Sequence, residues 1–241
     1  MSDYSPHKDH RQRLRTRFRN EGLYSFNDHN ILELLLFYAI PRKDTNELAH
    51  ALLKEFGSLA SVFDADPNLL MKVDGIGENA ATLIKLIPQL SRAYLMDKET
   101  RYPDFSDIHK LGTYLVNYFI GETKEKLIAV FLNNRVEMIG TFVISEGIVN
   151  RTEGSVRRLA EAAFANNAAS FVLAHNHPDG NSTPSAADIS LTTNYIKIFK
   201  NLGIPLAEHI VVGGSNYTGI LTQESSGRKY ATLPGIEKDN D

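Results

Sequence analysis

The hydrophobic pattern of the second half of the chain alternates between strand-like and helix-like segments. Apolar runs predict strands at residues 127–134, 135–145, 171–174 and 206–214. Amphipathic spacing predicts helices at residues 107–119, 155–167 and 185–202. The first two strands follow each other closely and are expected to pair antiparallel. Strands that alternate with helices predict an α/β fold, a mixed sheet flanked by helices.

The first half of the chain shows helical spacing only. Residues 26–37 and 45–56 each carry a broad apolar face and predict two helices. The polar stretch 96–107 contains a proline and is expected to hold the domain boundary. The sequence therefore predicts a small all-α domain at residues 1–100, an α/β domain at 107–227 and a polar tail at 228–241.

The sequence Val-Asp-Gly-Ile-Gly lies between two amphipathic segments within residues 68–92 and is typical of a helix-hairpin-helix. Its glycines permit a tight turn and expose backbone N–H groups that can hold a DNA phosphate. Gly75, Ile76 and Gly77 are the candidate nucleic-acid-binding residues. Two acidic residues, Asp74 and Glu78, flank the turn, where a DNA-binding hairpin usually has a basic residue. A glycine turn that only packs two helices therefore stays open as the alternative.

Composition narrows the function classes. Of the 241 residues, 42% are hydrophobic and 9% aromatic, enough for ordinary cores in a soluble globular protein. The N-terminal residues lack an apolar signal segment and no run approaches the length of a membrane span, so we expect a cytoplasmic protein without a membrane partner. The chain has no cysteine, which excludes a disulfide scaffold.

Charge alone does not call for nucleic acid, because the net charge is only −3. One basic segment, residues 7–20, is an exception with its five arginines. It has the charge to touch phosphate or an acidic partner, although a solvated helix face is favoured for so short a segment.

Two histidines end the predicted strand 171–174 and suggest a metal site. Residues two apart in a strand share a face, so His175 and His177 would present two imidazoles side by side. Asp188 follows in the first turn of the next predicted helix and would face back toward the strand end. Two histidines and one carboxylate leave a fourth zinc position open, as catalytic sites do. The alternative is structural: Ser185-x-x-Asp188 is also a helix-capping signature.

The spacing His175-x-His177-Pro178, then Ser185-x-x-Asp188, resembles the JAMM motif of MPN-type zinc metalloproteases. The longer sequence LAHNHPDGNSTPSAADI resembles the bacterial RadC branch, and the resemblance covers roughly residues 5 to 225. It implies a JAMM/MPN fold, which is cytidine-deaminase-like, after a helix-hairpin-helix region. It also implies that His175, His177 and Asp188 bind Zn²⁺ and that Ser185 lends a hydroxyl near the attacking water or the developing oxyanion.

In the JAMM pattern a glutamate at the start of an earlier strand acts as the general base, and the resemblance puts Glu125 there. Glu122 and Glu146 lie nearby and stay open as alternatives. The implied activity is zinc-dependent hydrolysis of a peptide or isopeptide bond, with the peptide or protein substrate and the oligomeric state undefined. The competing hypothesis is a DNA-associated accessory factor of repair, in which the hairpin binds DNA and the metal is structural; a nuclease is a third, less favoured one.

Two segments depart from the RadC pattern. Residues 155–158 keep only the arginine of a usual His-Pro-Arg-Glu run, and Glu208-His209 replaces a usual Asp-His pair. Neither departure touches an implied ligand. We expect His209 to be a packing residue or to support a ligand, because three ligands are already supplied.

Overall fold

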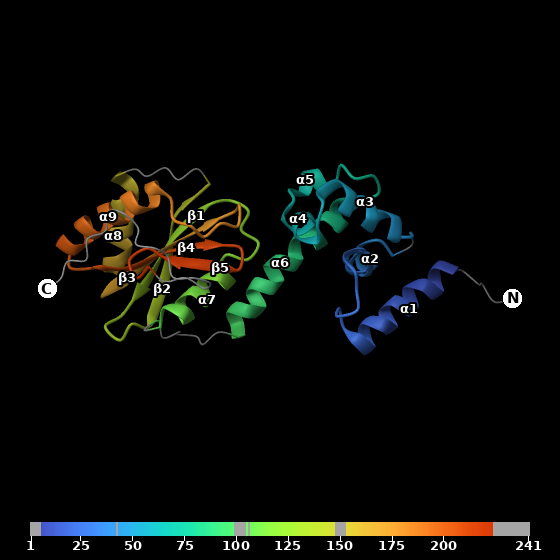
Figure 1. Cartoon of the computed structure of the whole chain (residues 1–241), viewed down its shortest axis with the longest axis horizontal. Helices are drawn as coiled ribbons and strands as arrows, with labels where there is room; N and C mark the ends of the chain where they lie inside the picture. Colours follow the sequence, from blue (N-terminus) through green and yellow to red (C-terminus); the bar gives the residue numbers. More distant parts are fainter. Residues whose placement is uncertain (1–5, 42, 99–104, 106, 148–152, 224–241) are drawn as a thin grey trace. The chain divides into compact units, whose positions relative to one another are not determined.

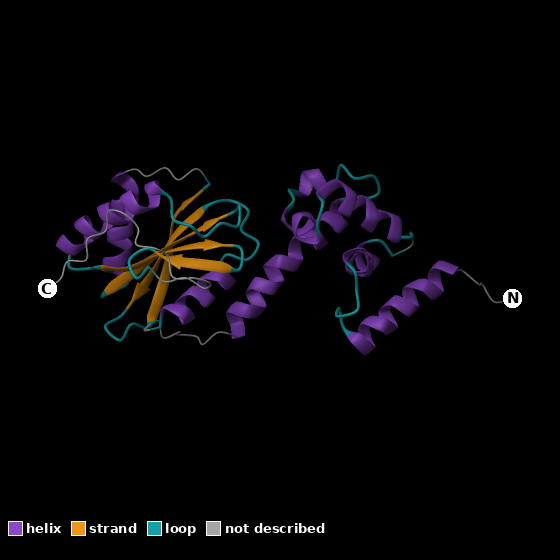
Figure 2. Ribbon diagram, in the orientation of Figure 1, coloured by secondary structure: helices purple, strands orange, loops and turns teal. Residues whose placement is uncertain are grey.

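The structure is a computed structural model that describes residues 6–41, 43–98, 105, 107–147 and 153–223 (Figures 1 and 2). The chain divides into two compact units, Met1–Ser91 and Arg92–Asp241. Residues 99–104 and 106 of the predicted boundary and the predicted tail 228–241 lie outside the described residues. Among the residues described, no helix combines the length and the apolar character that crossing a membrane requires.

The first unit is helical, as predicted. Its helices are α1 (Pro6–Glu21), α2 (Asp28–Ala39), α3 (Asn46–Phe56), α4 (Leu59–Asp64), α5 (Pro67–Leu70) and the beginning of α6 (Glu78–Lys98). The two predicted helices are confirmed as α2 and α3, each within two residues at its ends. Leu32 and Leu36 of α2 pack with Leu52 of α3 and Ile84 of α6 in one buried cluster.

The arginines of α1 are used partly inside the first unit. The Arg11 guanidinium donates to the carbonyls of Ile40 (2.7 Å) and Pro41 (2.9 Å) beyond the end of α2, and it lies over the Phe37 ring. Arg17 lies over another aromatic ring, that of Phe26. We expected the basic side chains of residues 7–20 to be solvated. Arg11 and Arg17 instead contact residues outside α1 and help to hold this helix in place.

The second unit contains one mixed sheet. Its strands, among the residues described, are β1 (Lys126–Leu132), β2 (Met138–Glu146), β3 (Ser170–His177), β4 (Leu206–Gly213) and β5 (Asn216–Gly219), in the order β2-β1-β3-β4-β5. β3 and β4 run parallel, and the other neighbours are antiparallel. This confirms the mixed sheet and the predicted pairing of the first two strands, while β5 was not predicted.

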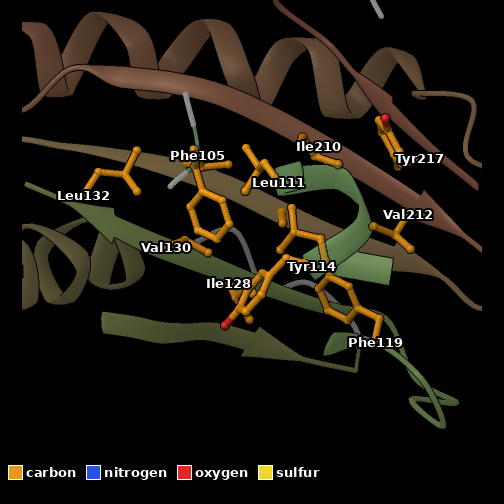
Figure 3. Packing of buried hydrophobic residues seen from close by; sticks show 13 residues of the cluster. Phe105, Leu111, Tyr114, Phe119, Ile128, Val130, Leu132, Ile210, Val212 and Tyr217 are labelled. Carbon is orange, nitrogen blue, oxygen red and sulfur yellow. The ribbon is translucent and has the colours of Figure 1, made fainter. Parts of the chain in front are cut away.

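Helices cover both faces of this sheet, which explains its continuous apolar strands. Along β1, Ile128 and Val130 face the same cluster as α7 (Ile108–Tyr118), whereas Ala129 and Phe131 belong to the opposite cluster. That opposite face carries α8 (Glu153–Ala165) and α9 (Ala186–Asn201). Figure 3 shows the α7 side, where Tyr114 of α7 and Tyr217 of β5 belong to one buried cluster.

The chain leaves the carboxyl end of β3, forms α9 and returns as the parallel strand β4. In such an arrangement the strand end and the helix N-terminus meet at one edge of the sheet, where α/β proteins commonly place their sites. The end of β3 and the first turn of α9 carry the predicted metal ligands, so the fold brings this chemistry to one place.

Candidate metal centre

The three predicted ligands converge at the junction of β3 and α9. His175 Nε2 lies 3.0 Å from His177 Nε2, and Asp188 Oδ1 lies 3.4 Å from His175 Nε2. Asp188 Oδ2 is 3.6 Å from His177 Nε2. β3 extends through His177, so the alternation of strand side chains turns both imidazoles to the α9 face. One atom from each residue forms a group of a size that could hold a metal ion.

The group is buried on one side and open on the other. The side chains of His175 and Asp188 are 2% and 4% exposed, whereas that of His177 is 20% exposed. A cation held here would therefore have protein behind it and a solvent-facing side near His177. This is the arrangement that a site needs in order to admit a substrate.

Asp188 takes part in the helix cap and also faces the two histidines. Its Oδ2 accepts from the Ser185 backbone N–H (2.8 Å) and hydroxyl (2.6 Å), and Ser185 Oγ accepts from the Asp188 N–H. The capping box thus fixes the carboxylate while Oδ1 points toward His175. Burial acts to raise the pKa of Asp188, but the close contact with the His175 imidazole and the hydrogen bonds from Ser185 hold that pKa well below its usual value.

Each histidine of the group is oriented by a partner behind it. His177 Nδ1 lies 2.7 Å from the backbone carbonyl of Asn181, which can only accept, so Nδ1 carries a proton and Nε2 is the nitrogen that faces Asp188. His175 Nδ1 lies 2.9 Å from Nε2 of the fully buried His209. This contact favours support of a ligand over packing alone, the two roles that the sequence left open for His209. Partners of this kind fix which nitrogen faces a metal.

The loop that carries Asn181 lies against β4 because residue 213 is glycine. A Cβ at Gly213 would lie 2.4 Å from the Asn181 carbonyl carbon and from the Ser182 nitrogen, both backbone atoms. A side chain here would push the loop outward. Gly213 thereby contributes to the position of the carbonyl that orients His177.

Contacts around β1 favour Glu125 among the three candidate bases. Leu127 pairs with His175, and the Glu125 carbonyl accepts from Gly147 N–H (2.8 Å), which continues the ladder toward the site. Alternation then puts the Glu125 side chain on the face of Leu127 and His175. Glu125 also stands opposite His177 when the register is extended by two residues.

The other two glutamates lie on the Lys126 side of this ladder. Lys126 Nζ is 3.0 Å from Glu122 Oε1 and 3.8 Å from Glu146 Oε2. Lys126 pairs with Glu146 across β1 and β2, and residues paired in this way share a face. Glu122 is also paired with Arg92. Both carboxylates thus form ion pairs with Lys126, on the face opposite to His175.

Asn176, between the two histidines, holds the segment that precedes β1. Its side-chain oxygen accepts from Lys126 N–H (2.9 Å), and its amide nitrogen donates to the carbonyls of Lys124 (3.0 Å) and Glu122 (3.3 Å). The side chain is buried. Asn176 therefore ties the strand of the histidines to the loop that contains Glu125.

The predicted hairpin residues lie in the first unit. Gly75 has φ of +88°, and Ile76 is 4% exposed in the helical core with its N–H donated to the Val73 carbonyl. Ile76 thus packs within the core rather than facing solvent. DNA binding by Gly75, Ile76 and Gly77 stays a prediction.

Sequence reasoning did not single out Asn176, Asn181, Thr192 or Gly213. For Thr192 a signal existed, because it follows Asp188 by one helical turn and so shares its side of α9. Glu208, one of the departures from the family pattern, is buried and accepts from the backbone N–H groups of His209, Leu221 and Thr222. It anchors the chain after β5.

The chain is similar to known proteins over most of its length. The family model of the RadC-like JAB domain matches residues 105–225, which include every residue of the candidate metal centre. The UPF0758 protein FN0909 of Fusobacterium nucleatum subsp. nucleatum is 39% identical over 223 residues, covering 89% of this chain and 95% of that protein. Neither name states a substrate or a reaction.

Proposed function

Because the chain belongs to the RadC-like JAB domain family, we propose that it is a zinc-dependent hydrolase that cleaves a peptide or isopeptide bond. One observation carries this proposal: the side chains of His175, His177 and Asp188 converge on one point with a solvent-facing side. A structural zinc is usually closed by four protein ligands, whereas three ligands and an open position are typical of catalysis.

The donor set fits zinc. Bonds of about 2.0–2.2 Å in tetrahedral geometry separate ligand atoms by about 3.3 Å. The separations here are 3.0, 3.4 and 3.6 Å, so small side-chain adjustments would suffice. Two imidazoles and one carboxylate suit zinc better than calcium or magnesium, which prefer oxygen ligands alone. Bound there, zinc would polarise a substrate carbonyl and lower the pKa of a water toward neutrality.

The roles of the remaining residues follow from their positions. Glu125 accepts a proton from the attacking water and passes it to the leaving nitrogen, as a general base and then acid. Ser185 donates its hydroxyl to Asp188 in the structure; on rotating, it would donate to the developing oxyanion instead. Asn176 acts through the backbone around Glu125 and keeps that loop in place.

The test begins with metal content, measured by mass spectrometry on the intact protein and on two variants. His177→Ala removes one ligand, and Asp188→Asn keeps an oxygen for the helix cap while it removes the charge that a cation needs. We expect about one zinc per chain in the parent protein and a loss in both variants. The zinc-loaded protein is then offered libraries of peptides and isopeptides, with the released amine detected.

Glu125→Gln should bind zinc like the parent protein and lose turnover, whereas Glu122→Gln should retain most of the activity. The second variant is matched, because it removes the charge of a carboxylate from the same loop. Retained turnover in Glu125→Gln would move the base to another residue. A protein that takes up no zinc when it is offered would refute the proposal.

A further inference from the structure

A buried chain of polar side chains runs from α9 to the metal centre. Thr192 Oγ1 is 2.6 Å from the Asp188 carbonyl and 2.7 Å from His209 Nδ1, while His209 Nε2 is 2.9 Å from His175 Nδ1. Thr192 and His209 are 1% and 0% exposed, so bulk water does not compete for these contacts. This series of hydrogen bonds therefore starts at the backbone of Asp188 and ends at the ring of His175, both of them predicted ligands.

The protons in this chain can be counted from one end. A backbone carbonyl only accepts, so the single Thr192 hydroxyl proton goes to Asp188 O. Thr192 Oγ1 must then accept, which puts the His209 proton on Nδ1. Burial favours the neutral form of the His209 imidazole, which then has its lone pair on Nε2, so His175 donates from Nδ1. The remaining nitrogen of His175, Nε2, is the one that faces Asp188.

We propose that Thr192 and His209 are positioning residues that keep the proton of His175 on Nδ1 and so present the Nε2 lone pair to the metal. The opposite tautomer of His175 would carry a hydrogen at Nε2, where the cation has to bind. It would also face the His209 Nε2 lone pair with a second lone pair. This inference rests on the metal site of the proposed function, and it concerns binding rather than hydrolysis.

This device complements the one at His177, where a backbone carbonyl fixes the proton on Nδ1. The carbonyl of Asn181 is part of the main chain and cannot be removed by a substitution. The support of His175 uses two side chains, so it can be removed. Outer partners of this kind typically change metal affinity by about 10- to 100-fold.

The variants come from one helix. Thr192→Val keeps the shape and removes the hydroxyl, and Thr192→Ser restores the hydroxyl. Thr193→Val is the matched control, because the Thr193 hydroxyl also bonds the carbonyl four residues back (Ile189, 2.9 Å) but is exposed and outside the chain. The three variants thus separate the loss of the hydrogen bond between Thr192 and His209 from the mere loss of a threonine in α9.

Two measurements follow. Long-range ¹H–¹⁵N spectra of the zinc-free protein, above the ordinary histidine pKa of about 6.5, report which ring nitrogen is protonated. His175→Gln and His209→Gln identify the two signals. Zinc affinity is measured by competition with a chromophoric chelator, using zinc alone as the ligand. We expect Nδ1 protonation for both histidines in the parent protein, and zinc affinity reduced tenfold or more in Thr192→Val.

Thr192→Ser should return both the affinity and the His209 spectrum toward those of the parent protein, and Thr193→Val should change neither. A parent spectrum with the His175 proton on Nε2 would overturn the inference, as would a Thr192→Val variant with unchanged affinity. Should Thr192→Val fail to fold, the parent spectrum and Thr192→Ser still decide. The expected spectra in a protein that cleaves no peptide would remove the proposed activity and support the inference.

Discussion

Substitution of Asn176 by alanine tests how the strand of the histidines controls the loop before β1. The side chain makes three hydrogen bonds, to Lys126 N–H and to the carbonyls of Lys124 and Glu122. A buried hydrogen bond contributes about 0.5–1.5 kcal/mol net, so we expect the free energy of unfolding to fall by about 2–4 kcal/mol. The loop around Glu125 should lose more order than the rest of the unit.

Hydrogen exchange at the Lys126 amide measures this directly, because its partner is the Asn176 side chain. The same loss of about 2–4 kcal/mol corresponds to exchange some tens to hundreds of times faster. Asn133→Ala is the matched control, since Asn133 bonds Arg135 N–H (2.8 Å) and Glu137 N–H (3.1 Å) beyond the other end of β1. It should lower stability without selecting the Lys126 amide.

Zinc content should be unchanged in Asn176→Ala, and turnover should fall because the general base is no longer held. Exchange of the Lys126 amide at the parent rate would refute the reasoning. Equal acceleration in Asn133→Ala would refute it too. Either result would mean that other contacts, such as the Gly147 bond to the Glu125 carbonyl, hold the loop by themselves.

Three further substitutions have defined outcomes. Gly213→Ala should weaken zinc binding and lower stability by about 1–3 kcal/mol in a denaturant titration, because the added Cβ displaces a backbone loop; Gly140→Ala, with a nearest atom at 3.5 Å, should not weaken zinc binding. Arg11→Lys should lower the melting temperature of the protein, since lysine cannot reach several carbonyls at once, whereas the exposed Arg13→Lys should not. Glu208→Gln should cost about 2–4 kcal/mol in chemical denaturation, because an amide cannot accept all three N–H bonds.

The layered fold was predictable because a strand that is buried on both faces is apolar at consecutive positions in the sequence. β1 is apolar at consecutive positions, and β3 shows the same pattern up to its histidines. The predicted RadC membership is confirmed by the family match and by the relative. That His175 and His177 lie on the same face of β3 followed from the alternation of side chains along a strand. β5 was missed because four residues that begin with an exposed asparagine give little periodicity.

The supporting residues of the metal centre could not be derived in the same way. Thr192 meets His209 only because α9 packs on the sheet with one rotation, and His209 meets His175 only in the observed register of β3 and β4. A shift of one residue in β4 would turn His209 to the α7 side. Such contacts depend on register and helix rotation, which composition and spacing do not define.

The capping box at Ser185 and Asp188 has a consequence for the energetics of metal capture. The carboxylate rotamer is fixed when α9 forms, so its conformational entropy is lost during folding and is not lost again when a cation arrives. Calorimetry of zinc binding should show a smaller entropic penalty in the parent protein than in Ser185→Ala, where the carboxylate must be ordered by the ion itself. The helix cap, worth about 0.5–2 kcal/mol to the fold, would then also strengthen zinc binding, because it holds the carboxylate in place before the ion arrives.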